Sequence, residues 1–226
     1  DKKTYPALKQ AVDKLINSEN LSEIYDVSLE NYTPDADNIT LAVLMHTSSM
    51  LSFSNCLERV KKLKAEEKEN LIKTACRYMQ FYDSVPREFE YVSLTYNMVI
   101  SASCFAQFKR HRMASMTTQA YNPQLGVTIP ESIIETGMER EFTEVIKKTE
   151  DAYSKIEKKL PDAAAYILTN AHRRRILLRC NARELYHISR LREDKHAQWD
   201  IRDKAKKMAG LAYRVMPLTA MLIGGK

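Results

Sequence analysis

The residues best suited to chemistry form a basic run, Lys109 to Arg112, with the sequence Lys-Arg-His-Arg. The eight residues that follow are neutral, so the sequence places no acid beside this charge. Guanidinium groups bind phosphates and planar anions through paired hydrogen bonds. Three interpretations stay open: a solvated helix end, a site for a phosphate or a negatively charged ring, and a nucleic-acid contact. Nucleic acid is disfavoured, because no aromatic residues alternate with the basic ones and no common nucleic-acid-binding module matches.

A second group of polar residues lies between positions 181 and 202, where the sequence has its longest helical pattern. Asn181, Arg183 and His187 supply hydrogen-bonding groups near its start, and Arg192 and His196 follow with a spacing of four. That spacing predicts that Arg192 and His196 share one helical face. Because buried polar groups are costly unless they are hydrogen-bonded, the pattern favours a large, polar, ring-shaped ligand.

Strands and helices must position these residues, and their pattern predicts an α+β fold. The alternation over residues 88–100 predicts a strand that contains Glu90, followed by a helix that Ser101 or Ser103 caps. The basic run would then end that helix, where the helix dipole favours cations. Further helices are predicted over residues 6–17, from a cap at Asp37 or Asn38, over 64–83, over 139–160 and through 181–215, with a short helix and a strand over 161–180.

The composition narrows the class of protein. The chain has 226 residues, a net charge of +6, and four scattered cysteines that we interpret as reduced core thiols. It has no signal-peptide pattern and no apolar run of membrane-spanning length, so a cytoplasmic protein without membrane contact is expected. No glycine-rich phosphate loop, catalytic triad or HExxH motif is present, and the histidines lack zinc-type spacing, so no metal site is predicted.

Two segments together resemble the flavin-dependent thymidylate synthases. "RHRMASMTTQA" at 110–120 is similar to their Arg-His-Arg signature, and "NARELYHISRLREDKHAQWDIR" at 181–202 is similar to their second conserved helix. The resemblance implies one domain over 1–226, or one half of a longer chain, with a mixed or antiparallel sheet and long helices. It also implies a homotetramer, or a hetero-oligomer with a homologous chain, that binds FAD between subunits.

The activity implied by the resemblance is reductive methylation of dUMP, with methylenetetrahydrofolate and NADPH as co-substrates. The residues that would contact FAD, matched position by position, are Glu90, Arg110, His111, Arg112, Asn181, Arg183, His187, Leu191 and His196. Gln107 and Arg192 would face the dUMP-like nucleotide, and Arg192 would stabilise negative charge on the uracil during catalysis.

Several positions depart from the family pattern, mostly on the nucleotide side. The signature Ser is Ala120 here, the Arg and Tyr that follow are Asn122 and Pro123, and a further Arg is Ala165. Three readings therefore stay open. The sequence favours an active enzyme of a divergent branch, and the alternatives are a flavin-binding paralogue with another substrate and a silent subunit that completes sites on a competent partner.

Overall fold

A four-stranded antiparallel sheet forms the centre of the molecule. The computed structural model describes residues 3–16, 25–80 and 82–224. Within these ranges the sheet has the order β1-β2-β4-β3, and every neighbouring pair is antiparallel. The strands are β1 (Val27–Tyr32), β2 (Ser93–Ser101), β3 (Ser115–Thr118) and β4 (Arg173–Asn181). The predicted α+β class with an antiparallel sheet is confirmed.

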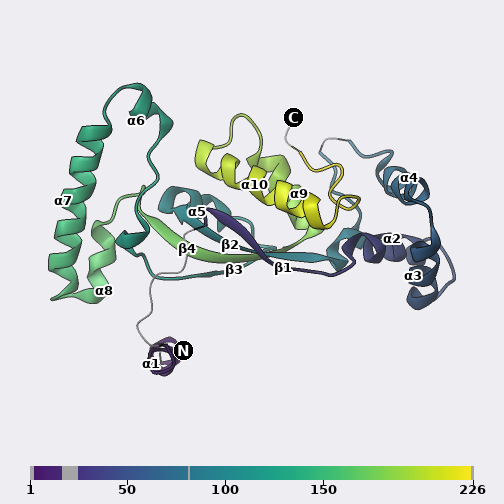
Figure 1. Cartoon of the computed structure of the whole chain (residues 1–226), viewed down its shortest axis with the longest axis horizontal. Coiled ribbons are helices and arrows are strands. Elements are labelled where there is room, and N and C mark those ends of the chain that lie inside the picture. The colour runs from purple at the N-terminus through teal and green to yellow at the C-terminus, as the bar shows by residue number, and fades with distance from the viewer. Residues whose placement is uncertain (1–2, 17–24, 81, 225–226) are drawn as a thin grey trace.

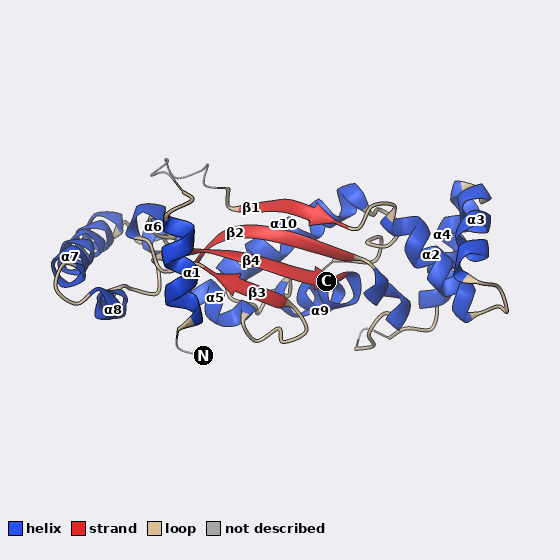
Figure 2. Ribbon diagram, turned by 90° about the horizontal axis from the view of Figure 1, so that it is seen from below, coloured by secondary structure: helices blue, strands red, loops and turns tan. Residues whose placement is uncertain are grey.

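Helices cover one face of the sheet and extend beyond both of its ends (Figure 1). Seen from below, the strands lie in front of α5 (Ala102–Phe108), α9 (Ala182–Arg192) and α10 (Trp199–Val215) (Figure 2). One end carries α2 (Ala36–Thr47), α3 (Phe53–Lys62) and α4 (Ala65–Cys76), and the other carries α6 (Glu131–Glu135), α7 (Glu139–Glu157) and α8 (Pro161–Ala164). Helix α1 is Thr4–Asp13, and short 3-10 turns span Arg87–Tyr91, Pro123–Leu125 and Ala165–Ile167.

The core lies between the sheet and its covering helices. Alternate side chains of β2 point to this face, and Leu94, Tyr96 and Met98 are almost fully buried there. The Tyr96 hydroxyl donates a hydrogen bond to the main-chain oxygen of Met208 on α10, at 3.1 Å. The opposite face is more polar, as expected when only one side of an antiparallel sheet is covered. The two helices that carry the predicted site, α5 and α9, are therefore held on one side of β2 and β4.

An ion network beneath α10 anchors the start of α5. Lys204 contacts Asp26, Asp200 and Asp203 at 2.7, 3.2 and 3.0 Å. The Ser101 hydroxyl donates to Asp200 at 2.5 Å and accepts from the backbone N–H of Cys104, as a helix N-cap does. The predicted cap at Ser101 is confirmed, and the network fixes the end of α5 opposite the basic run.

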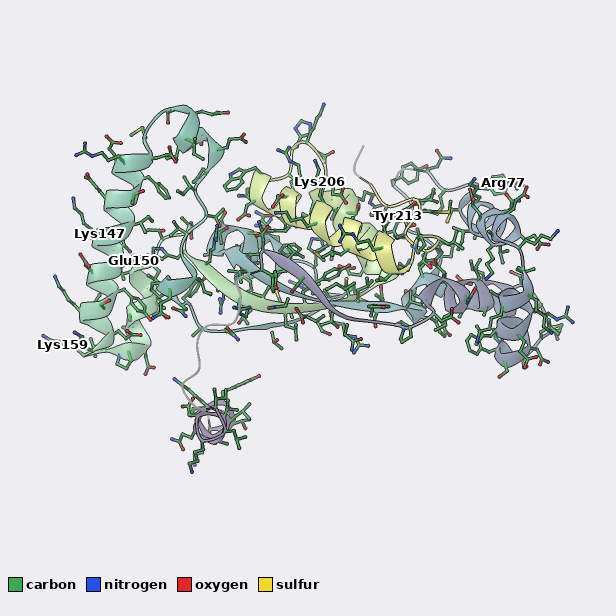
Figure 3. All side chains as sticks on the ribbon, viewed as in Figure 1. Arg77, Lys147, Glu150, Lys159, Lys206 and Tyr213 are labelled. Atoms are coloured by element: carbon green, nitrogen blue, oxygen red, sulfur yellow. The ribbon has the colours of Figure 1, made fainter. Side chains whose placement is uncertain are left out.

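The outer end of the molecule formed by α7 is joined to β4 through a buried histidine. Lys147 and Lys159 extend away from the sheet, whereas Glu150 lies on its side of α7 (Figure 3). The Glu150 carboxylate is 3.8 Å from Nε2 of His172, which is fully buried beside the first residue of β4. The predicted long helix after residue 139 and the strand that follows it are both confirmed.

Three local predictions are wrong. Neither Asp37 nor Asn38 caps α2, because the helix begins at Ala36 and the Asp37 carboxylate instead accepts the backbone N–H groups of Leu218 and Thr219. Glu90 lies in a 3-10 turn rather than in a strand, because the chain turns after Pro86 and pairing begins at Ser93. The pattern over 181–215 is two helices, α9 and α10, separated by a turn.

Two further sequence predictions can be compared with the described residues. All four cysteines are free and buried, which confirms the interpretation as core thiols. The predicted helix over 6–17 is found as Thr4–Asp13, and residue 17 lies outside the described residues.

Candidate functional site

Arg192, the last residue of α9, contacts two other predicted site residues, Gln107 and His111, and these three form the nucleotide-side group. Its Nε donates to Nε2 of His111 at 2.9 Å, and its Nη1 donates to the side-chain oxygen of Gln107 at 3.0 Å. A guanidinium can only donate, so Nε2 of His111 accepts and the ring proton sits on Nδ1. That Nδ1 is 3.3 Å from the carboxylate of Glu184, and both side chains are buried. The geometry thus holds Arg192 in one orientation at the end of α5.

Within the described structure, every hydrogen bond of Arg192 runs to a neutral acceptor. These acceptors are the His111 ring and the side-chain and main-chain oxygens of Gln107. Burial lowers the pKa of Arg192, and the charge of nearby Arg110 lowers it further. Two cations therefore lie close together without a carboxylate in contact with Arg192. An arrangement of this kind is suited to an anionic or electron-rich ligand.

A pocket on the adjacent side of α9 is lined by three other predicted site residues, Arg183, His187 and Leu191, which form the pocket-side group. It has a volume of about 710 Å³ and lies between α9, the end of α4 with the loop after it, and the C-terminal segment. Its walls are mostly apolar, formed in part by Met79, Val85 and Ile223. Three residues that the sequence assigned to flavin contacts, Arg183, His187 and Leu191, line it. Its volume is in the range of small-molecule and cofactor pockets.

Glu90 lies beside this pocket through its ion pair with Arg183. Arg183 Nη1 is 2.9 Å from the Glu90 carboxylate, and its Nε donates to the main-chain oxygen of Val85 at 2.9 Å. Arg87 makes a second, more exposed pair with Glu90. Hydrogen bonds from Arg87 and then Arg183 lower the pKa of Glu90, so the carboxylate is charged at neutral pH. The 3-10 turn thereby fixes the orientation of Arg183 at the pocket wall.

His187 links the two groups. Its ring meets the His111 ring edge-on, with 5.7 Å between ring centroids, and the residue also lines the pocket. Burial lowers the pKa of His187, and the nearby His111, Arg190 and Arg192 lower it further. Arg190 was not predicted as a site residue, although its spacing of three from His187 was a signal for contact on one helical face.

Three predicted residues, Asn181, Arg112 and His196, lie outside this arrangement, and a fourth, Arg110, is exposed but lies close enough for its charge to lower the pKa of Arg192. Asn181 is the N-cap of α9, and its side-chain oxygen accepts the backbone N–H of Glu184 at 2.8 Å. Arg110 and Arg112 are exposed just after α5. His196 is exposed in the turn after α9, so the predicted shared face with Arg192 is wrong. The chain turns there because the Asp194 carboxylate accepts the His196 N–H and Gln198 caps α10.

The positions that depart from the family pattern carry little that could bind a phosphate. Ala120 and Ala165 are exposed, and the Asn122 side chain accepts the backbone N–H of Gln124. Arg174 lies between the rings of Phe105 and Tyr121, 4.6 and 4.4 Å from their centroids, and donates to the main-chain oxygen of Gln119. The Arg174 guanidinium is thus already engaged by contacts within the chain.

A family model described as thymidylate synthase complementing protein, Thy1, matches residues 28–218. The chain belongs to the Thy1 family. The match covers both groups of site residues, and relatives named flavin-dependent thymidylate synthase confirm the family resemblance read from the sequence. One of these, from Clostridium tetani, is 29% identical over 215 residues, which cover 84% of this chain and 83% of that protein.

Two other similar proteins allow the length and the fold of this chain to be compared. A UPF0159 protein of Chlamydia pneumoniae is 24% identical over 216 residues, which cover 95% of this chain but only 40% of that protein. The chain therefore spans less than half the length of this relative. The crystal structure of the UMP/dUMP methylase PolB from Streptomyces cacaoi, bound with 5-Br dUMP, has the same fold. Its TM-score is 0.69, with 17% identity over 89% of this chain and 94% of that chain.

The described ranges contain neither a metal-binding cluster nor a membrane-spanning helix. No group of three or more His, Cys, Asp or Glu side chains there is placed to hold a metal ion. No helix in those ranges is both long enough and apolar enough to cross a bilayer.

Proposed function

We propose that this chain binds FAD and a uridine nucleotide such as dUMP, and that it acts as a flavin-dependent methyltransferase of the thymidylate synthase type. The observation that carries the proposal is the state of Arg192, which Gln107 and His111 orient without neutralising. A guanidinium held in this way, with Arg110 nearby, has no counter-charge in contact with it, and negative charge that develops on a bound uracil or on reduced flavin would supply one. Membership of the Thy1 family supports the same ligands.

The residues present fit a flavin. The pocket beside α9 combines apolar walls with the edge groups of Arg183 and His187, which suits a flat heteroaromatic ring. Arg183, His187, Leu191 and Glu90 would hold the ring region, and the exposed cations Arg110 and Arg112, with the buried His111, would face the more anionic part of the cofactor. FAD, when bound and reduced by NADPH, supplies the hydride for a methylation whose carbon comes from methylenetetrahydrofolate.

Within this proposal, the side chains bind and polarise rather than react covalently. Arg192 would stabilise negative charge that develops on the uracil, and a preorganised donor of this kind costs little reorganisation during the reaction. Gln107 and His111 hold its guanidinium, and the Glu184 carboxylate lies 3.3 Å from Nδ1 of the His111 ring. Because no protein nucleophile is required, Ala120 in place of Ser affects nucleotide binding more than the chemistry. The uridine nucleotide class is further supported by the UMP/dUMP methylase with the same fold.

The test is the visible absorption spectrum of the purified protein with FAD, recorded during a titration with dUMP. The proposal would be supported if dUMP perturbs the flavin spectrum of the wild type and if Arg192→Lys binds dUMP about tenfold or more weakly. Lysine keeps the charge but loses the paired geometry, a loss of roughly 1.5–3 kcal/mol for a charged hydrogen bond. Arg140→Gln, on the distant α7, is the control. A wild-type protein that binds no FAD would contradict the proposal.

A second candidate is a subunit that contributes flavin contacts while a homologous partner binds the nucleotide. The exposed Ala120 and Ala165 and the internally bonded Asn122 favour it, because none of them offers a phosphate contact. The greater length of the Chlamydia pneumoniae relative also leaves room for a second domain of this size. Binding of FAD without any response to dUMP, regained on mixing with a homologous chain, would select this candidate. Light scattering would show whether the chain alone forms the proposed homotetramer.

A further inference from the structure

Arg190 occupies a central position at the pocket rim. Its Nη1 donates to the main-chain oxygens of Tyr82 and Asp83, at 2.7 and 3.0 Å, in the loop that closes one side of the pocket. Its Nη2 is 3.3 Å from Nδ1 of His187. The guanidinium therefore joins the loop of residues 82–83 to the imidazole on α9. Because two carbonyl groups fix Nη1, the direction of Nη2 is fixed as well.

The contact between Arg190 and His187 determines which nitrogen of the imidazole carries the proton. Arginine has five N–H donors and no acceptor, so Nδ1 of His187 must accept the hydrogen bond. The neutral ring then carries its proton on Nε2. With Nδ1 engaged by Arg190, the Nε2–H is the remaining hydrogen-bonding group of the ring. Since His187 lines the pocket, this N–H is the group that the ring can offer to a ligand.

The charged and titratable groups around His187 favour the neutral ring. On α9 these are Glu184, Arg190 and Arg192, with Arg183 and Asp194 also on the pocket wall. His111 faces the ring from the segment after α5, Asp83 from the loop and Cys76 from the end of α4. Burial is the main cause that lowers the pKa of His187; Glu184 opposes it, and His111, Arg190 and Arg192 lower the pKa further. The ring is therefore neutral at pH 7, and its tautomer is a defined property of the site.

We propose that Arg190 is a positioning residue that holds His187 as the Nε2–H tautomer, so that the imidazole presents a hydrogen-bond donor to an acceptor on the ligand ring. The inference rests on the proposed binding of a flavin ring in this pocket. Isoalloxazine carries carbonyl oxygens and unprotonated ring nitrogens at its edge, which are acceptors for such a donor. Arg190 acts through His187 and needs no contact with the cofactor.

The test combines NMR of the full chain with FAD binding. In protein labelled with ¹⁵N-histidine, long-range ¹H–¹⁵N spectra report the tautomer and pKa of His187, assigned with His187→Asn. In Arg190→Gln we expect both tautomers, a higher pKa for His187, and FAD binding weaker by about tenfold, the change that 1.4 kcal/mol produces. Arg190→Lys should keep only part of the wild-type tautomer preference and FAD affinity, because one ammonium cannot bridge two carbonyl groups and a ring nitrogen with the same geometry. Arg140→Gln is the charge-matched control.

A double-mutant cycle separates this role from simple stabilisation of the loop. If Arg190 acts through His187, then Arg190→Gln should weaken FAD binding little further in the His187→Asn background. An equal loss in both backgrounds, or an unchanged His187 tautomer in Arg190→Gln, would overturn the inference. The signals of the buried His111 and His172 report whether each variant is folded. Failure of the wild type to bind FAD would refute the proposed function instead, and the NMR spectra would still decide whether Arg190 sets the tautomer.

Discussion

Replacement of Lys204 by Met should destabilise the protein strongly, because it leaves a buried carboxylate without a counter-charge. Asp200 is fully buried, and Lys204 is the cation that it contacts, at 3.2 Å. Asp26 and Asp203 are part-exposed and can turn to water, so the cost falls mainly on Asp200. Removal of one partner from a buried ion pair costs about 3–5 kcal/mol. For a chain of this size that corresponds to a fall in melting temperature of about 6–20 °C.

The double variant Lys204→Met with Asp200→Asn tests the reason for the loss. The amide carries no charge, so the free energy of unfolding should recover to within about 1–2 kcal/mol of the wild type. Thermal and urea unfolding, followed by circular dichroism, measure both variants, and Lys206→Met on the exposed side of α10 is the control. A loss below about 1 kcal/mol for Lys204→Met, or no recovery in the double variant, would refute the reasoning. The network also caps α5 through Ser101, so the single variant should bind nucleotide less tightly.

Three other predictions follow from the same contacts. The pKa of both His172 and His187 is lowered by burial, so the unfolded state binds protons first as pH falls below about 6.5. The free energy of unfolding should therefore be constant above that pH and decrease below it, and His172→Gln should reduce the slope in urea titrations. Glu90→Gln should weaken FAD binding by a few-fold, through loss of the Arg183 pair, as measured by flavin fluorescence. Burial raises the pKa of Cys104 and Cys180, so these thiols should react with a thiol reagent only at the rate of unfolding.

The sequence was sufficient for the elements in which local and tertiary preferences agree. Ser101 caps α5 because its hydroxyl meets the first free N–H groups of the helix, a local interaction. The amphipathic pattern after residue 139 likewise became α7. Glu90 was misplaced because alternation continues through a 3-10 turn that Pro86 and the ion pair with Arg183 stabilise. That pair joins residues far apart in the sequence, so no local pattern contains it.

The break between α9 and α10 shows a second limit of sequence reasoning. A helical spacing continues from 185 to 199, through Leu185, Ile188, Arg192, Lys195 and Trp199. Asp194 and Gln198 nevertheless use their side chains to bond backbone N–H groups, and one helix ends before the next begins. Asp and similar residues compete in this way with the helical backbone. The contact of Arg190 with the loop at Tyr82 also depends on tertiary structure, so only its spacing from His187 was visible.

The pocket-side and nucleotide-side groups of site residues differ in how completely their side chains are paired, and His187 lies between the two groups. On the pocket side, Glu90 orients Arg183, and the loop at residues 82–83 holds Arg190, which contacts His187. On the nucleotide side, Gln107 and His111 hold Arg192, while the cation beside Ala120, Arg174, is bonded to Gln119 and packs on the Tyr121 ring. A chain selected only for its fold would gain nothing from an oriented guanidinium without a counter-charge, because desolvation of that charge is costly. The orientation of Arg192 in this state therefore favours a ligand that supplies the missing negative charge.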